Sequence, residues 1–547
     1  MYQLTKLENN LESVLKKFNI AEKIDIKLTR NKSFDLQINN LVKFKDNPNL
    51  IEILDNFQKE HDSEPIIKKY EISEKNFINI EINLNEFLKT VENIRNFIKV
   101  SSPKKIIFDY GGPNIGKPLH VGHLRSLNIG RSLYNVNKLA GNTVLSDIHM
   151  GDWGMPIAQI IQYGIEKKID FENITIQELE EIYPIASDLY SKNNDFTQLA
   201  QNINKNLNNN QKDLINKWKK IKGTSLRSLE STLDQLNHKF DLWRGESDVN
   251  DLIPDMIEDL KSKNKISLDD GAYVSSLKTD PKILITKSDG SYLYLTTDLA
   301  TVLDRLDSFE FDKTLYIVDK RQKLHFEQLF LSLEYFDFPT KEYEHISFGT
   351  VNDADGNPFK TREGGTKKLT DLYDETYKYI KAINNDLDDI SLGLLSNTVL
   401  TYSDLITNRN TDYKFDLEKF TNVNGKTGIY IQYANVRAKK LINDSSLEVS
   451  NFSIVSEELD GNDKNLLRSF IKFEFYFEQT IKNNEPHHLA DYLYEISQKF
   501  NGMYQGTNIL ENENTVLKEN KLKITDLFLK YSNLVMECLG ILPVEKM

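Results

Sequence analysis

A short apolar run, Ile106 to Phe108, ends at a Gly-Gly-Pro turn and is followed by a helical pattern that opens near His120. This order constrains the fold most strongly, because parallel α/β sheets are built from strand, tight turn and helix. The first N–H groups of such a helix are unpaired, and together with the helix dipole they favour an anion. His120 and His123 should share one face of the first turn, and Gly122 lets a nucleotide approach the backbone. We predict a phosphate site; alternatively, both histidines are ordinary surface residues.

Composition limits the class of protein. The 547 residues leave room for about three or four domains, and 39% apolar with 28% charged residues is typical of soluble globular proteins. No apolar run approaches the ~20 residues of a membrane span, and the first ten residues lack the apolar core of a secretion signal. The single cysteine, Cys538, excludes an intramolecular disulfide and a Cys-built zinc site. We expect a cytoplasmic protein without a membrane partner.

The charge is unevenly distributed along the chain. The net charge of −13 argues at first sight against a nucleic-acid partner. Residues 1–100 are, however, neutral, and residues 426–547 carry only −3, so that −10 falls on residues 101–425. An acidic centre favours a cationic small substrate, although for any single charge a solvated surface is the default interpretation.

The hydrophobic pattern divides the chain into three parts. Residues 1–100 show a helical pattern and then period-two runs at 24–28, 34–38 and 78–84, which predicts a small α+β module. Residues 101–425 alternate strands with helices, which predicts a parallel sheet interrupted by a helical insertion at about 169–279. Residues 426–547 are dominated by helical patterns.

Two details of the central part are specific predictions. We expect the sheet to resume with strands at 283–286, 292–295 and 314–318, with a helix from Thr296 that a hydroxyl or Asp298 could cap. After this comes a glycine-rich loop containing Lys360 and Arg362, whose two cations suit an extended polyphosphate.

The central motif resembles the signature of a known family. Pro113-Asn-Ile-Gly-Lys-Pro-Leu-His-Val-Gly-His-Leu-Arg-Ser126, here called the histidine motif, resembles that of class I aminoacyl-tRNA synthetases and specifically of arginyl-tRNA synthetases. Further stretches match that family in the same order: 149–154, 294–298, 322–325, 359–364, 430–437 and the ending Leu-Gly-Ile-Leu-Pro-Val-Glu-Lys-Met547. The resemblance spans about residues 101–547, and the first hundred residues fit only by position.

The resemblance implies a Rossmann-like catalytic domain at 101–425, a C-terminal all-α helical-bundle domain that binds the anticodon, and an N-terminal α+β domain that contacts tRNA. It implies activation of L-arginine by ATP, as its Mg²⁺ complex, and transfer of arginine to the terminal ribose of tRNA(Arg). It implies no zinc, and we expect a monomer. The catalytic residues would be His120, His123, Lys117, Lys360 and Arg362. Because this loop has Lys-Thr-Arg where class I enzymes generally have two lysines, Lys117 would compensate; it could also be a solvated loop lysine.

The resemblance also places the ligands residue by residue. ATP contacts would fall on Gly122, Pro113, His149, Gly151, Asp152 and His325. Arginine contacts would fall on Asp109, Asn114, Tyr294, Asp298 and Gln322. A guanidinium pairs bidentately with carboxylates, although Asp298 could merely cap a helix. Asp109 stands where the family often has Glu, so its partner atom is open. A site with a buried carboxylate rejects neutral analogues, so no editing domain is expected.

Recognition of tRNA would involve the C-terminal helices. Unpaired bases are read by stacking and by hydrogen bonds to their edges, for which the sequence offers Tyr430, Tyr433, Asn435, Arg437, Tyr492 and Tyr504. Aromatic residues at helical spacing are more often core, so only a subset would face RNA.

Three alternatives remain. Another class I synthetase is disfavoured because zinc ligands and a large hydrolytic insertion are absent from the sequence. A small nucleotidylyltransferase with His-x-Gly-His needs no helical C-terminal module. A catalytically inactive relative that only binds RNA is disfavoured by the intact His120, His123, Lys117 and Lys360.

Overall fold

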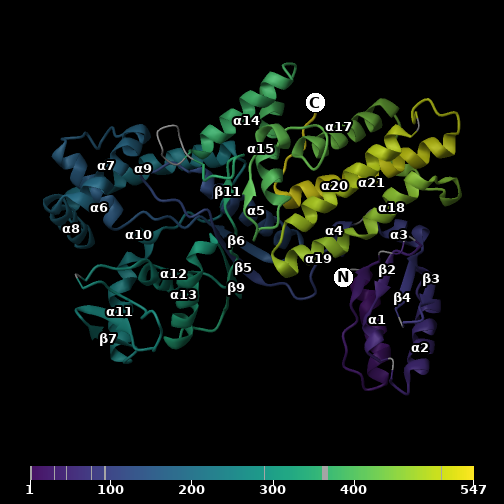
Figure 1. The fold of residues 1–547 in the computed structure, drawn as a ribbon, viewed down its shortest axis with the longest axis horizontal. Coiled ribbons are helices and arrows are strands. Elements are labelled where there is room, and N and C mark those ends of the chain that lie inside the picture. Colours follow the sequence, from purple (N-terminus) through teal and green to yellow (C-terminus); the bar gives the residue numbers. More distant parts are fainter. Residues whose placement is uncertain are drawn as a thin grey trace.

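The structure is a computed structural model that describes residues 3–29, 31, 33–44, 46–75, 77–91, 94–288, 290–359, 367–506 and 508–547. The N-terminal module lies beside the C-terminal helices, and helices α6 to α8 lie at the opposite end of the molecule (Figure 1). Among the described residues, no helix combines the length and the apolar character needed to cross a membrane.

The central sheet is parallel, as predicted. Its four strands are β5 (Lys105–Tyr110), β6 (Thr143–Asp147), β9 (Lys313–Ile317) and β10 (Glu342–His345), in the order β10-β9-β5-β6. Ile107 pairs with Leu145 on one side and with Thr314 on the other. Strand β5 is therefore an inner strand, and its apolar run is buried because both faces of the sheet are covered there.

Two of the predicted strands are wrong. Residues 283–286 and 292–295 form only isolated bridges, Val274 with Leu284 and Thr286 with Tyr292, next to a small hairpin of β7 (Ile266–Asp269) and β8 (Ala272–Ser275). Ile283 and Ile285 are buried in an apolar cluster with helices rather than in the sheet. A short apolar run does not specify which partner buries it, so periodicity alone could not decide this.

The expected helix cap is also wrong. Helix α12 (Tyr294–Ser308) begins before Thr296, and its N-cap residue Leu293 makes no side-chain cap bond. Asp298 therefore lies inside the helix, beyond the position from which a side chain caps the first N–H groups. Its carboxylate pairs with His325 instead.

Helices fill most of the range predicted as an insertion, beginning with α7 (Ile176–Lys192), α8 (Asn194–Asn208) and α9 (Lys212–Gln235). Helix α6 (Met155–Glu166) comes directly before this range. The chain then returns to the sheet edge, where Leu242 and Gly245 bridge in parallel to Asp147 and Met150. Beyond this edge follow α10 (Glu246–Val249), α11 (Ile253–Ser262), α12, η4 (Lys320–Gln322) and α13 (Lys323–Tyr335).

The N-terminal module is α+β, as predicted. Its antiparallel sheet has the order β1-β2-β4-β3, formed by β1 (Ile26–Leu28), β2 (Leu36–Ile38), β4 (Ile78–Ile82) and β3 (Ile67–Ile72), and it is accompanied by α1 (Gln3–Lys17), α2 (Leu50–Ser63), α3 (Leu84–Val91) and α4 (Ile94–Phe97). The sequence analysis missed β3, a mostly exposed strand with polar residues at its centre. Arg468 joins the module to the C-terminal helices through ion pairs with Asp35 and Glu81.

The C-terminal part is helical, as predicted. After β11 (Val351–Asn352) the chain forms α14 (Leu369–Ile383), α15 (Asp389–Leu405), β12 (Tyr413–Lys414), α16 (Leu417–Phe420), α17 (Gly428–Ser445), α18 (Gly461–Ile471), α19 (Phe473–Asn483), α20 (His487–Gln505) and α21 (Thr515–Leu539). Helix α5 (Leu124–Leu139) is buried between the sheet and these helices (Figure 1). The helix that begins in the histidine motif is therefore part of the C-terminal packing.

Candidate active site

The histidine motif forms a short 3₁₀ turn, η2 (Val121–His123), that leads directly into α5. His120 Nδ1 accepts a hydrogen bond from the Gly122 N–H at 3.0 Å, and His123 Nδ1 accepts one from the His120 N–H at 3.1 Å. The two rings lie 4.0 Å apart. Gly122 is required because a Cβ there would lie 2.7 Å from His120 Cε1.

Both imidazoles are neutral. Burial, followed by the charges of Lys117 and Arg321, lowers the pKa of His120, and burial and the neighbouring His120 lower the pKa of His123 to about 3. His120 Nδ1 accepts a backbone N–H, so its ring proton resides on Nε2. His123 Nδ1 lies 3.1 Å from the His120 N and 3.2 Å from the His120 O, and we assign the His123 proton to Nε2 so that Nδ1 accepts the N–H. The turn thus presents two neutral N–H donors.

Cations surround these donors. Lys117 precedes the turn, and the Arg321 charge acts on His120. Lys368 forms an antiparallel backbone bridge with His120, which brings the segment after the glycine-rich loop to the motif. Lys360 and Arg362, predicted in that loop, lie outside the described residues.

A second glycine turn lies against the motif. The Gly151 N–H donates to Pro113 O at 2.9 Å, and the Ile115 N–H donates to Gly151 O at 3.1 Å. A Cβ at Gly151 would lie 2.0 Å from Asn114 Oδ1, so only glycine permits this approach. Exposed Asn114 thus lies beside the predicted nucleotide turn.

Two of the predicted ATP contacts have partners inside the chain. The buried Asp152 carboxylate accepts from the Ser247 N–H at 2.8 Å and pairs with Lys222 Nζ at 2.5 Å. His149 Nε2 lies 3.4 Å from Thr301 Oγ1. In this structure Asp152 therefore holds the turn at 245–247.

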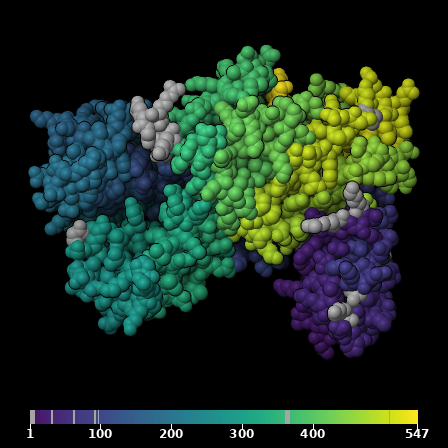
Figure 2. Space-filling view, viewed as in Figure 1, coloured from purple at the N-terminus to yellow at the C-terminus, as the bar shows by residue number. Residues whose placement is uncertain are grey.

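Of the two predicted arginine contacts on α12, Tyr294 lines a pocket of about 140 Å³ and Asp298 does not. Tyr294 and Thr297 contribute from α12, together with Trp153, Asn204, Asn208, Glu246, Asn250, Lys287 and Tyr292. Asp298, one turn after Tyr294, pairs with His325 Nε2 at 2.5 Å. Gln322 is exposed at the end of η4. The surface is hollowed between the helical insert and the part of the chain that contains α11 to α13 (Figure 2).

Glu246 is a pocket residue that the sequence analysis missed. Burial and the negative charges of Asp298 and Asp152 raise its pKa to about 8. Glu246 is therefore mostly protonated at pH 7, and a cation placed near it would favour the ionised carboxylate. In the sequence, only its position could have pointed to Glu246, because it directly follows Gly245, which bridges to the edge of the sheet.

Asp109 already has a cation within the chain. Arg305 Nη2 lies 2.5 Å from Asp109 Oδ2 and 2.7 Å from Asp147 Oδ2, and all three side chains are nearly buried. Arg305 thus joins α12 to β5 and β6.

Comparisons with known proteins agree with this arrangement. A family model described as "tRNA synthetases class I (R), catalytic domain" matches residues 86–417, and the "DALR anticodon binding domain" model matches residues 431–547. An arginine–tRNA ligase of Francisella tularensis subsp. novicida is 32% identical over 577 aligned positions, covering 99% of each chain.

The chain belongs to the arginyl-tRNA synthetase family. The arginyl-tRNA synthetase of Plasmodium falciparum superposes with a TM-score of 0.80 at 25% identity and covers 99% of both chains. The Thermus thermophilus arginyl-tRNA synthetase gives 0.81 at 18% identity, over 99% of this chain and 100% of that one, and shares the fold.

The residues of this chain that were predicted to contact tRNA differ in accessibility. Tyr430, Tyr433, Arg437 and Tyr504 are half-buried. Asn435 is buried and donates from Nδ2 to Ser532 Oγ and Asn533 Oδ1, each at 2.9 Å. Tyr492 is fully buried. The buried Asn435 and Tyr492 belong to the core of the helical domain. For Tyr492 this agrees with the expectation that an aromatic residue at helical spacing is more often core.

Arg437 is held between two of these tyrosines. Its guanidinium lies 4.0 Å from the Tyr433 ring and 5.4 Å from the Tyr504 ring, and Nη2 donates to Tyr433 Oη at 2.7 Å. The structure thus brings three of the predicted residues into one half-buried cluster.

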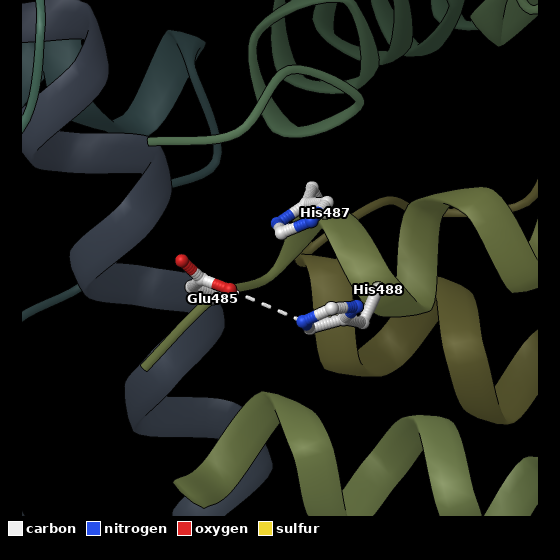
Figure 3. Close-up of side chains that lie close together, drawn as sticks. All are labelled: Glu485, His487 and His488. Carbon is white, nitrogen blue, oxygen red and sulfur yellow. Dashed lines mark hydrogen bonds and ion pairs between the residues drawn. The ribbon is translucent and has the colours of Figure 1, made fainter. Parts of the chain in front are cut away.

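A separate group of metal-ligand type lies at the start of α20. His488 Nε2 is 3.1 Å from Glu485 Oε2 (Figure 3). Glu485 Oε1 accepts a hydrogen bond from Asn408 Nδ2 at 3.1 Å. His487 lies next to them, and burial and the charge of His488 lower its pKa. These bonds join α20 to the loop after α15, which accounts for the group structurally. The expectation of no zinc stays a prediction.

Proposed function

We propose that this protein activates L-arginine with ATP to arginyl-adenylate and transfers the arginyl group to the 3′-terminal ribose of tRNA(Arg). Family membership gives the reaction class. The observation that carries the substrate is the pocket lined by Glu246 and Tyr294, where the charge of Asp298 acts on Glu246. The histidine turn supplies two neutral donors in the same domain.

Activation requires attack of the arginine carboxylate on the α-phosphate, with pyrophosphate as the leaving group. The pentavalent transition state gathers negative charge on its oxygens, and preorganised donors stabilise it. The Nε2–H groups of His120 and His123 suit this role, because they need no change of protonation. Lys117 and Arg321 would contact the phosphates, with Lys360 and Arg362 from the loop and Mg²⁺ arriving with ATP.

Arginine recognition requires charge and shape together. A guanidinium offers a planar fork of donors, which the carboxylates of Asp298 and Glu246 would accept, with Tyr294 covering it. Asn114 and Gln322 remain for the α-amino and α-carboxylate groups. Asp109 would act through Arg305, whose salt bridge positions α12. A neutral analogue would leave the half-buried Glu246 carboxylate without a cation, so we propose no editing site.

The tRNA would extend over the two terminal parts. We propose residues 426–547 as the anticodon-binding domain and residues 1–100 as a second tRNA contact. A groove of about 790 Å³ lies between them, lined among others by Asn31 and Phe34 from the N-terminal module and by Arg468, Lys472 and Lys499 from the helices. We also propose a monomeric, cytoplasmic enzyme.

The decisive experiment is aminoacylation of total tRNA with each of the twenty amino acids in turn. We expect charging with arginine alone. Charging with another amino acid while arginine fails would contradict the assignment.

A further inference from the structure

One face of helix α7 in the insert contacts two lysines near the histidine motif, Lys117 and Lys368. Lys117 Nζ lies 3.8 Å from the centroid of the Tyr183 ring, and Lys368 Nζ lies 2.5 Å from Glu180 Oε2. Residues 180 and 183 are one turn apart and therefore neighbours on the helix surface. Since the charge of Lys117 acts on His120 and the backbone of Lys368 bridges to His120, α7 reaches the catalytic turn.

We propose that Tyr183 is a positioning residue, whose ring holds the Lys117 ammonium beside His120, where an ATP phosphate binds. This rests on the proposed role of Lys117 in phosphate binding. A lysine side chain has four flexible carbons and gains little precision from its own structure. The aromatic face attracts the ammonium but carries no net charge, so the charge of Lys117 stays available for a phosphate. A carboxylate in this place would neutralise it, as Glu180 does for Lys368.

The loop before Lys117 is shaped to this ring. Gly116 has φ of +78°, and a Cβ there would lie 2.7 Å from Ile160 Cδ1 and 3.7 Å from Tyr183 Cδ2. Tyr183 is half-buried and packs against the apolar cluster of the insert, which includes Ile160. The ring is thus fixed by the insert, and the glycine lets the loop pass closely enough for the next residue to meet the ring face.

The same ring also lies near the arginine pocket. The pKa of Tyr294 is raised by burial, by Glu246 and by Tyr183. Tyr183 thus acts electrostatically on Tyr294 as well as contacting Lys117.

The test measures arginine-dependent ATP–pyrophosphate exchange by the full-length enzyme with tRNA present. Tyr183→Leu removes the ring face and should raise the KM for ATP by about 3- to 30-fold, with little change in the KM for arginine. Tyr183→Phe keeps the face and should stay within about twofold of the wild type. Tyr190→Leu is the matched control, because Tyr190 is also half-buried on α7 and packs against the same cluster.

Lys117→Met separates this proposal from the role of Lys117 itself. If Lys117→Met leaves the KM for ATP unchanged, the proposed phosphate role of Lys117 fails, and the positioning role fails with it. If Lys117→Met impairs ATP binding, Tyr183→Leu should add nothing in that background. Three results would overturn the positioning role and leave that of Lys117 intact. The first is an equal further rise in the KM for ATP when Tyr183→Leu is added to Lys117→Met. The others are a Tyr183→Phe variant as impaired as Tyr183→Leu, and the same defect in Tyr190→Leu.

Discussion

The two histidines of the motif are donors because of where their rings lie. Their Nδ1 atoms are occupied by backbone N–H groups of the same turn, and burial keeps the rings neutral. Each ring therefore has one fixed role in the turn and one N–H available for a ligand.

His123→Ala should lower arginyl-adenylate formation by about 100-fold or more, because it removes one transition-state donor. Single-turnover formation of the adenylate measures this, and tRNA affinity should stay near that of the wild type. His123→Asn is the matched control, since its amide oxygen can still accept the His120 N–H while its NH₂ donates; it should lose less. A fully active Ala variant would refute the phosphate role.

Glu246 predicts a pH dependence of arginine binding. Its pKa of about 8 means that it is mostly protonated at pH 7, and only the carboxylate attracts a guanidinium, which stays charged throughout. The KM for arginine should therefore fall as pH rises from about 6.5 to about 8.5 and level off above that. Glu246→Gln should weaken arginine binding and flatten this profile; an unchanged profile would exclude Glu246 as its source.

At the scale of elements, α5 joins the histidine turn η2 to the C-terminal helices. Arg125, directly after the turn, pairs through Nε with Asp404 of α15 at 2.8 Å and donates through Nη1 to Thr411 O. Arg131, two turns on, donates to Thr401 Oγ1 of the same helix at 2.9 Å. Because Arg125 and Asp404 are both buried, the pair fixes the relative position of two helices.

Asp404→Ala should lower the free energy of unfolding by about 3–5 kcal/mol, because it leaves the Arg125 charge buried without its partner. Denaturant-induced unfolding measures this. Asp188→Ala is the control: it breaks the exposed Lys192–Asp188 pair on α7, which should cost below about 0.5 kcal/mol. An equal loss of unfolding free energy in the two variants would show that the buried pair contributes no more to stability than the exposed pair.

At the scale of the molecule, the N-terminal module and the C-terminal helices lie side by side (Figure 1). The N-terminal module contacts the C-terminal helices through Arg468 with Asp35 and Glu81, and Arg95 pairs with Glu537. Helix α5 packs against both α19 and α21. A tRNA held by these parts thus has a continuous structural connection to the histidine motif.

We expect arginine-dependent pyrophosphate exchange to require tRNA(Arg), as in the family the motif resembles. The measurement compares exchange with and without the tRNA at saturating arginine and ATP. A tRNA with an altered anticodon is the matched control and should support less exchange. Substantial exchange without any tRNA would contradict this expectation.

The sequence by itself determined the local structure around the histidine motif. The apolar run at 106–108, the Gly-Gly-Pro turn and the histidine spacing predicted β5, the turn and α5, since strand and helix periods and tight turns follow from neighbouring residues. It also indicated the family, through motifs whose residues are close in the chain.

Only the tertiary structure decided what depends on residues far apart in the chain. It paired Asp109 with Arg305 and Asp404 with Arg125. It buried Asn435, which local pattern had offered to RNA, and it brought Glu246 to the pocket near Asp298. A periodic pattern gives the face of an element but not the partner that covers it. The histidine turn was thus predictable, whereas the ring of Tyr183 beside its lysine was not.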